Sequence, residues 1–368
     1  MKIASIEITH HSLPLDPPYN ASFDTRPKTT HGMSLVRVTT DEGVTGIGAG
    51  HAMHTFAGHE DLFIGEDPLA LERHYRVLNN LHFYYGRPWP LDIALWDLAG
   101  KLTGQPAWRM LGGLSDRCAA YASTGSLRSA QETADLAEHC LERGFRAIKL
   151  RFGRPSWRDD VAVVAAVRAR VGDRMEVMVD CNQGWRMPWD TRAPWQLKDA
   201  LVVARALEEL GVYWMEEPLH RGDIEGMAAL RQATSLRIAG GEGNLEVYEF
   251  TNLVDRHCLD VLQPDVTWCG GISGLRRVAI MAQEHSVMFT PHAWTNGVGM
   301  LANMHLAAGL AGSPYVEFPY DPPGWTPDRR DYALTAPVEI TPDGLVVLGE
   351  APGLGVELDE DRLAATLA

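Results

Sequence analysis

Residues 145–153, FRAIKLRFG, contain the pattern on which the fold assignment depends. Apolar and polar residues alternate, and the segment ends in two cations, Lys149 and Arg151. Side chains two residues apart on a β-strand point to the same face, so both cations should project from one strand end. Two like charges placed together are unfavourable unless an anionic group lies opposite them. The segment therefore predicts a strand whose carboxyl end faces a negatively charged site.

A helix should precede this strand, because both of its ends are marked. Ser129 with Glu132 three residues later forms a capping box, and Gly144 supplies the stop. The same alternation of helix and strand recurs along the chain, with further strands expected at residues 119–123, 176–179, 212–215, 236–239, 259–262, 287–289 and 315–317. Alternating units of this kind predict a parallel sheet, and eight strands in about 200 residues favour a closed barrel over an open sheet.

The region before this repeat has a different pattern. Residues 1–50 are typical of antiparallel strands, interrupted by residues 14–31, which have the polar, Pro-rich composition of a mobile loop. Residues 67–81 and 91–111 show helical spacing. We therefore expect an α+β domain over residues 1–115.

The end of the chain also departs from the repeat. Pro and Gly are frequent from Phe318 onward, and residues 338–347 are typical of strands. We expect the barrel to occupy residues 116–319 and the tail, residues 320–368, to return to the first domain.

Gly46, Gly48 and Gly50 could be mistaken for a dinucleotide-binding loop. Such a loop follows a parallel strand and opens a helix. These glycines instead lie on the return strand of an expected hairpin, and no helix pattern follows directly. We interpret them as strand glycines.

Composition excludes several classes of partner. The 368 residues include 33 Lys and Arg against 48 Asp and Glu, a net charge of −15, which argues against nucleic acid and anionic membrane surfaces. No signal-peptide core and no apolar run of membrane-spanning length is present. Five scattered cysteines without a CxxC pair predict reduced thiols. We expect a cytoplasmic protein that acts on a small molecule.

The ends of the expected barrel strands are polar or charged. In a barrel of this kind the chemistry gathers at the carboxyl ends of the strands. One such residue often belongs only to a turn, but seven successive strands ending this way are improbable by chance. The residues are Lys149, Arg151, Asp180, Asn182, Glu216, Glu217, Glu242, Asp265, His292 and Glu317.

Three acids from adjacent strands, Asp180, Glu216 and Glu242, predict a metal site. Oxygen ligands without a nearby thiolate or histidine pair suit Mg²⁺ with open coordination positions. Without a cation, three converging carboxylates would repel one another. The alternative is that each acid pairs with a separate arginine on the barrel rim.

His292 and Asp265 lie on consecutive expected strands. An aspartate behind a histidine fixes its tautomer and raises its basicity, as a general base requires. The alternative is a core histidine bonded to the backbone.

Taken together, these motifs resemble the enolase superfamily and, within it, the mandelate racemase subgroup. The resemblance extends over nearly the full length and is carried by Ala94-Leu95-Trp96-Asp97, residues 106–113, the Lys149/Arg151 pair, Asp180-Cys181-Asn182, Trp214-Met215-Glu216-Glu217-Pro218, Gly241-Glu242, Gln263-Pro264-Asp265, His292, Glu317 and Pro352-Gly353-Leu354-Gly355. It implies a modified TIM barrel, (β/α)7β, with an α+β capping domain formed by the N-terminal region and the C-terminal tail. It also implies a homo-oligomer.

The resemblance also implies roles for the residues at the site. Asp180, Glu216 and Glu242 would bind Mg²⁺, with Glu216 preferred to Glu217. Asp265 and His292 would move the proton α to a substrate carboxylate, through an enediolate that Lys149 helps to stabilise. Glu317 would be a protonated acid bonded to the substrate carboxylate, and Asn182 would face the ligand.

Arg151 departs from the subgroup's two-base pattern, in which a lysine at this position is the second base. A guanidinium group, with a pKa above about 12, does not readily release its proton. We therefore expect one base, His292, and dehydration of an acid sugar, an aldonate or aldarate, to a 2-keto-3-deoxy acid by a hydro-lyase. A racemase, epimerase or sugar-lactone cycloisomerase is the alternative, particularly if Lys149 reaches the α-carbon. A binding protein without turnover is a third hypothesis, which the intact base and its partners disfavour.

Two segments of the first domain, residues 14–31 and 50–58, should determine specificity. Their polar residues, among them His31, His51 and His54, favour a polyhydroxylated substrate over an aromatic one. The alternative is that surface loops are simply polar. Trp294 either closes the pocket or packs beside it.

Overall fold

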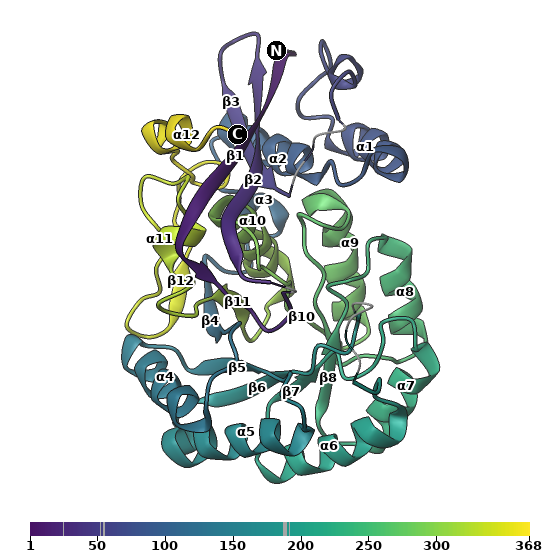
Figure 1. Cartoon of the computed structure of the whole chain (residues 1–368). Coiled ribbons are helices and arrows are strands. Elements are labelled where there is room, and N and C mark those ends of the chain that lie inside the picture. The colour runs from purple at the N-terminus through teal and green to yellow at the C-terminus, as the bar shows by residue number, and fades with distance from the viewer. Residues whose placement is uncertain (25, 52, 54–55, 187–189, 191) are drawn as a thin grey trace.

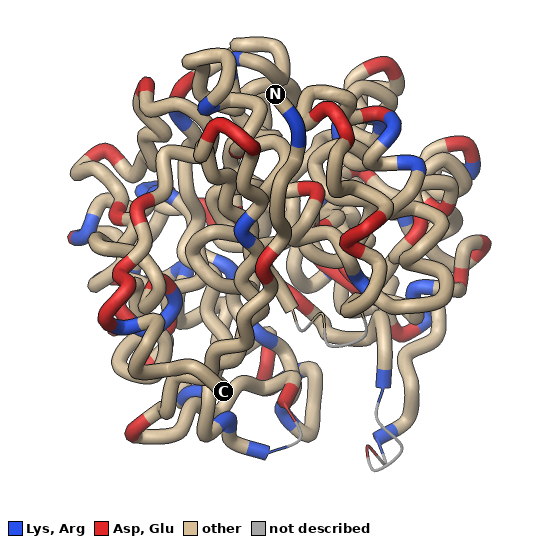
Figure 2. The backbone as a smooth tube through the Cα atoms, turned by 90° about the horizontal axis from the view of Figure 1, so that it is seen from above, with Lys and Arg blue, Asp and Glu red and all other residues tan. Residues whose placement is uncertain are grey.

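The computed structural model describes the chain except residues 25, 52, 54–55, 187–189 and 191. A three-stranded antiparallel sheet with its helices lies against a curled parallel sheet (Figure 1). His54, expected near the substrate, lies outside the described residues. Within the described residues, no helix combines the length and apolar character of a membrane span. Basic and acidic residues are both scattered over the molecule (Figure 2).

The parallel sheet contains eight strands of the repeat. They are β4 (Arg117–Ser123), β5 (Ala147–Arg151), β6 (Glu176–Asp180), β7 (Trp214–Glu216), β8 (Arg237–Gly240), β9 (Val261–Leu262), β10 (Met288–Phe289) and β11 (Val316–Pro319). Strands β4 to β10 lie in chain order, and each pairs in parallel with its neighbours in that series. Strand β11 pairs in parallel with β4. Among the described residues, β10 and β11 are not hydrogen-bonded to each other.

Seven helices connect these strands, in agreement with the expected (β/α)7β order. They are α4 (Ala130–Arg143), α5 (Trp157–Val171), α6 (Leu197–Glu209), α7 (Ile224–Ala233), α8 (Val247–Asp255), α9 (Gly271–Glu284) and α10 (Gly297–Leu306), the last continued by a π-helical turn, Ala307–Ala311. Helices α4–α8 lie along the outer side of the sheet (Figure 1). The predicted fold class, a modified TIM barrel with a capping domain, is confirmed.

The sequence signals of the first βα unit act as expected. The Ser129 side chain accepts a hydrogen bond from the Glu132 N–H, and Gly144 ends α4 in a left-handed conformation, φ +115°. On β5, Ala147, Lys149 and Arg151 share one face by the period of two. Ala147 belongs to a small apolar cluster inside the sheet with Tyr121, Met178, Trp214, Ala239 and Val261. Lys149 lies above this layer, with its Nζ 5.5 Å from the centre of the Tyr121 ring.

The capping region consists of β1 (Ile3–Tyr19), β2 (Lys28–Thr40), β3 (Thr45–Gly50), a 3₁₀ turn (Glu60–Leu62), α1 (Leu71–Tyr85), α2 (Trp89–Thr103) and α3 (Ala107–Leu111). Its glycines at 46 and 48 lie on the antiparallel strand β3. A Cβ atom at Gly48 would overlap the Pro90 carbonyl oxygen, and one at Gly46 the Ala94 carbonyl oxygen. These glycines therefore allow α2 to approach the strand closely, and no helix opens after them.

Two local expectations were wrong. Most of residues 14–31 is strand, because β1 continues to Tyr19 and β2 begins at Lys28. The prolines are tolerated since β1 is the edge strand of its sheet, where a missing N–H does not break a ladder. Residues 91–111 form two helices, because α2 ends at Gly104, with φ +67°, and α3 starts after Pro106.

The tail contacts both parts of the chain. It contains α11 (Pro327–Arg330), β12 (Leu345–Val347) and α12 (Glu360–Thr366). The strand expected over 338–347 is short, and it pairs antiparallel with β4 of the barrel. Helix α12 lies against β1, where the His11 ring nitrogen is 3.1 Å from the Leu363 carbonyl oxygen. The domain boundaries at residues 115 and 319 stay a prediction.

Candidate active site

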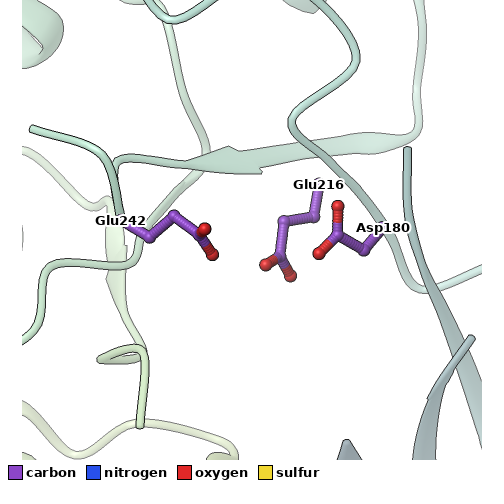
Figure 3. Close-up of side chains that lie close together, drawn as sticks. All are labelled: Asp180, Glu216 and Glu242. Atoms are coloured by element: carbon purple, nitrogen blue, oxygen red, sulfur yellow. The ribbon is translucent and has the colours of Figure 1, made fainter. Parts of the chain in front are cut away.

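The three acids expected to bind metal lie together at the carboxyl ends of neighbouring strands (Figure 3). Asp180 ends β6, Glu216 ends β7, and Glu242 follows β8 by two residues. One carboxylate oxygen from each of the three lies within 4.8 Å of the other two. Parallel pairing of β6 with β7 places Asp180 directly opposite Glu216. Glu217 is not part of this group: it has φ +45°, and its carboxylate lies against Gly184.

Two buried cations contact the acids. The Lys149 ammonium lies 2.7 and 2.8 Å from the two oxygens of Glu216 and 2.8 Å from Glu317. Burial alone would lower the pKa of Lys149, but the charges of Glu216 and Glu317 outweigh it and raise that pKa. The predicted same-face cation pair therefore meets its anions inside the barrel.

Arg151 is fixed by several acceptors. Its guanidinium donates to the Asp180 carboxylate, to the Thr124 carbonyl oxygen at 2.6 Å and to the Ser123 hydroxyl at 3.2 Å. Each of its terminal nitrogens and its Nε thus has a protein partner. This arrangement orients the arginine and leaves no role for it as a proton acceptor.

The charges of the three acids are only partly compensated. Burial raises the pKa of Asp180, Glu216 and Glu242, and the nearby cations oppose this rise without cancelling it. A buried cluster of carboxylates with raised pKa values is stabilised by a further cation. The donor set is all oxygen, which suits a hard divalent ion such as Mg²⁺.

His292 and Asp265 form the expected pair. The His292 Nδ1 lies 2.9 Å from an Asp265 carboxylate oxygen. The other oxygen of Asp265 accepts hydrogen bonds from the Thr267 N–H and hydroxyl, both at 2.8 Å, and from the Asn303 amide at 3.0 Å. Burial would lower the pKa of His292, but Glu242, Glu317 and Asp265 together raise it to about 9. Asp265 therefore orients the imidazole and strengthens it as a base.

A cavity of about 440 Å³ opens in front of this pair. Six of the residues expected at the site line it: His51, Arg151, Asn182, Glu242, His292 and Trp294. Burial lowers the pKa of His51 to about 4, so its imidazole is neutral, and its Nε2 has no hydrogen-bond partner among the described residues. The Trp294 indole N–H donates to Ser123 at 2.8 Å, so this side chain both lines the cavity and packs.

The other expected residues lie behind this surface. Lys149, Asp180, Glu216, Asp265 and Glu317 are almost fully buried. Among the described residues, none of these five belongs to the cavity lining.

His31 does not reach the cavity. Its ring packs between Trp325 and Tyr332, with ring centres 4.8 and 5.5 Å away, and burial lowers its pKa to about 3. Strand β2 begins at Lys28, earlier than expected, so His31 lies within the sheet and not in a loop. The position of His31 therefore does not support the hypothesis that it contacts substrate.

Glu317 lies among three hydrogen-bond donors. Its carboxylate accepts hydrogen bonds from the Ser123 hydroxyl at 2.7 Å and the Ala293 N–H at 2.6 Å, beside the Lys149 ammonium. Burial would raise its pKa, but Lys149, His292 and Arg151 hold it far below the usual range. Three donors around its carboxylate therefore favour the ionised form in this arrangement. The expected role of Glu317 as a protonated acid bonded to the substrate carboxylate stays a prediction.

Several cavity residues were not predicted. They are Arg87, Trp185, Arg221, Gly243, Leu245 and Trp268. Phe23, Asp24 and Lys28, in contrast, belong to residues 14–31, the segment that the sequence predicts to determine specificity. Trp268 lies three residues after Asp265, so its place at a strand end could have marked it. Arg87 lies between two helices of the capping region, where no sequence motif marks it.

The chain was compared with families and with known proteins. The model named "Mandelate racemase / muconate lactonizing enzyme, N-terminal domain" matches residues 3–112, and "Enolase C-terminal domain-like" matches residues 132–362, more than half of the chain. The chain therefore belongs to the enolase superfamily. The paired matches place it, more narrowly, in the mandelate racemase subgroup, as the sequence motifs predicted.

Individual relatives carry out different reactions. The chain is 32% identical to 3,6-anhydro-alpha-L-galactonate cycloisomerase of Streptomyces coelicolor, over 91% of this chain and 92% of the relative. It is 30% identical to arabinonate dehydratase of Saccharolobus solfataricus, over 72% of this chain and 68% of the relative. A crystal structure of L-talarate dehydratase from Polaromonas sp. JS666, complexed with Mg and L-glucarate, superposes with a TM-score of 0.86 at 28% identity, covering 100% and 97% of the two chains. The protein is an enzyme of this superfamily, and similarity alone does not assign its reaction.

We predict that the His292 imidazole titrates near pH 9 in the metal-free protein and that Asp265→Asn lowers its pKa, because the variant removes an anionic hydrogen-bond partner of the imidazolium. NMR titration of labelled histidine measures both values. His305, whose pKa burial lowers to about 4, is an internal control that should stay neutral near pH 6 in both proteins. An unshifted His292 pKa in the variant would contradict this interpretation of the pair.

Proposed function

We propose that this protein is a Mg²⁺-dependent acid-sugar dehydratase. Its substrate would be a polyhydroxylated carboxylate, an aldonate or aldarate, and its product a 2-keto-3-deoxy acid. The observation that carries the proposal is that the cavity offers two unlike groups. One is the base His292, which Asp265 orients, and the other is Arg151, at the position where the subgroup has its second base.

Asp180, Glu216 and Glu242 would hold the Mg²⁺. The all-oxygen donor set and the incompletely compensated charge fit that ion, and a related dehydratase was crystallised with Mg. When bound, the ion would stabilise negative charge that develops on the substrate carboxylate. The homo-oligomer that the resemblance implies stays a prediction.

His292 would take the α-proton. Its Nδ1 is engaged by Asp265, which leaves Nε2, 3.6 Å from a Glu242 oxygen, as the proton acceptor. The substrate carboxylate would lie at the acid cluster, so its α-carbon would come next to this nitrogen. Lys149, buried beside Glu216, would add positive charge under the developing enediolate.

At the position of the subgroup's second base, this chain has Arg151. Arg151 faces the cavity but cannot release its proton readily, and Lys149 is buried behind the acids and does not line the cavity. Racemisation requires a base on each face of the α-carbon. Elimination requires only one, because the proton is not returned to that carbon from the other side.

A single base is sufficient to complete the elimination, with every proton and electron pair accounted for. The bond from the α-carbon to hydrogen breaks, the electrons form the α–β double bond, and the hydroxyl leaves from the β-carbon. The protonated His292 can give its proton to that hydroxyl, so water leaves and the imidazole returns to its neutral form. The enol product then tautomerises to the keto acid.

A second candidate, favoured by the similarity to the cycloisomerase, uses the same first step. If the β-oxygen belongs to a ring in the substrate, its departure opens the ring and the product is an isomer. Arg151 and His292 would act as above, and only the substrate would differ.

We predict that Mg²⁺ binding depends on Glu216 and not on Glu217. Isothermal titration of Mg²⁺ should show a loss of affinity of at least about tenfold for Glu216→Gln, which removes a ligand charge. The matched variant Glu217→Gln removes the neighbouring carboxylate, which lies outside the cluster, and should bind nearly as the parent does. An equal loss in both variants would contradict this prediction, because Glu217 would then contribute to binding as much as Glu216. Unchanged affinity in Glu216→Gln would show that the ion is bound elsewhere.

We predict that the enzyme with Mg²⁺ converts at least one member of a library of aldonic and aldaric acids to a 2-keto acid. Semicarbazide detection and mass spectrometry would measure the keto group and the loss of water. His292→Asn should lower the rate by at least about 10²-fold, because it removes the base. A product of unchanged mass would identify a cycloisomerase or epimerase and overturn the dehydration step.

A further inference from the structure

The side chains that line the cavity carry more positive than negative charge, although buried acids lie behind them. The chain has a net charge of −15, yet four cations line the cavity, Lys28, Arg87, Arg151 and Arg221, against two acids, Asp24 and Glu242. Such an excess of positive charge in a recess of an acidic protein favours an anionic ligand.

Two of these cations already have acidic partners. Arg151 is bonded to Asp180, and the Lys28 ammonium lies 3.3 Å from Asp24. Arg221 is largely exposed, with its Cδ against Gly243, so water can solvate its guanidinium. These three therefore do not require a charged group of the substrate.

Arg87 differs because, among the described residues, no acid lies within salt-bridge distance of its guanidinium and no acceptor is hydrogen-bonded to it. The buried Asp265 acts on it only through its charge, from farther away. It is partly buried in the turn between α1 and α2, and its guanidinium lies 4.9 Å from the centre of the Trp268 ring. Removing a charge from water without a partner is costly, and stacking on an indole only partly replaces a counter-ion. The planar fork of a guanidinium matches a carboxylate or phosphate in geometry.

Trp268 links Arg87 to the catalytic side of the cavity. The centre of its ring lies 4.9 Å from that of His292, so Arg87 and His292 both pack against the Trp268 indole. A substrate with its first carboxylate at the acid cluster and its α-carbon at His292 would extend past Trp268. The far end of a sugar-acid chain would then reach Arg87.

We propose that Arg87 binds a second anionic group at the far end of the substrate, which makes the substrate a dianionic sugar acid such as a hexaric acid. This inference rests on the proposed function, which places the first carboxylate and the α-carbon. It narrows the substrate class from aldonates and aldarates to those with a charged terminus.

The test compares binding of hexaric acids with that of hexonic acids of the same configuration at carbons 2 to 5. Titration calorimetry would use the Mg²⁺-loaded His292→Asn protein, so that no ligand is consumed. At least one hexarate should bind about tenfold or more tightly than its hexonate partner, as expected for a charged hydrogen-bonded pair. Arg87→Met in the same background should reduce that hexarate to the affinity of the hexonate and leave the hexonate unchanged.

Arg76→Met, an identical exchange on the exposed side of α1, is the matched control and should change neither affinity. A 6-phosphohexonate in parallel distinguishes a terminal phosphate from a terminal carboxylate, since both would depend on Arg87. Two results would overturn the inference. One is that ligands with a charged terminus and ligands with an uncharged terminus bind with equal affinity. The other is that Arg87→Met lowers the affinities for the hexarate and the hexonate equally.

The outcome is separable from that of the proposed function. Dehydration of hexonates and hexarates with equal efficiency would refute the role of Arg87 and leave the dehydratase intact. Binding of hexarates that depends on Arg87, without formation of any keto acid by the unmodified enzyme, would refute dehydration and leave the anion site intact.

Discussion

The convergence of Asp180, Glu216 and Glu242 is the constraint on which the site depends. Three parallel strands bring one oxygen of each of these carboxylates within 4.8 Å of the others. Asp180 and Glu216 are buried and Glu242 is partly buried, so mutual repulsion and desolvation both disfavour their charges. The two cations of β5 offset part of this cost from within the barrel, since Lys149 contacts Glu216 and Arg151 contacts Asp180. The remaining imbalance favours a divalent ion, and that ion would in turn hold a substrate carboxylate.

The same charges divide the cavity into two unlike faces. On one face, Asp265 is held by Thr267 and Asn303 and so orients His292. On the other, Arg151 donates to Asp180, Thr124 and Ser123 and stays protonated at neutral pH, so it cannot accept a proton. A one-sided base is sufficient for β-elimination, and this asymmetry separates the proposed reaction from racemisation.

Most of the architecture and the cluster of three acids could be predicted because both follow from local pattern. The capping box at Ser129, the stop at Gly144 and the acids at successive strand ends are signals of one strand or one helix. The edge strand through Pro14 could not be predicted, because its prolines are acceptable only on a sheet edge, which is a property of the tertiary fold. The charge of Glu317 and the place of Arg87 likewise depend on neighbours distant in sequence, Lys149 and Trp268.

The claim that one base serves the site is tested most directly by α-proton exchange in D₂O. The His292→Asn protein, loaded with Mg²⁺, would be incubated with an acid sugar that the unmodified enzyme consumes and, separately, with its epimer at carbon 2. Proton NMR would follow the signal at that carbon. A single base predicts no exchange from either epimer. Exchange from one of them would reveal a second base, with Lys149 as the first candidate, and would contradict the assignment of the reaction to one face.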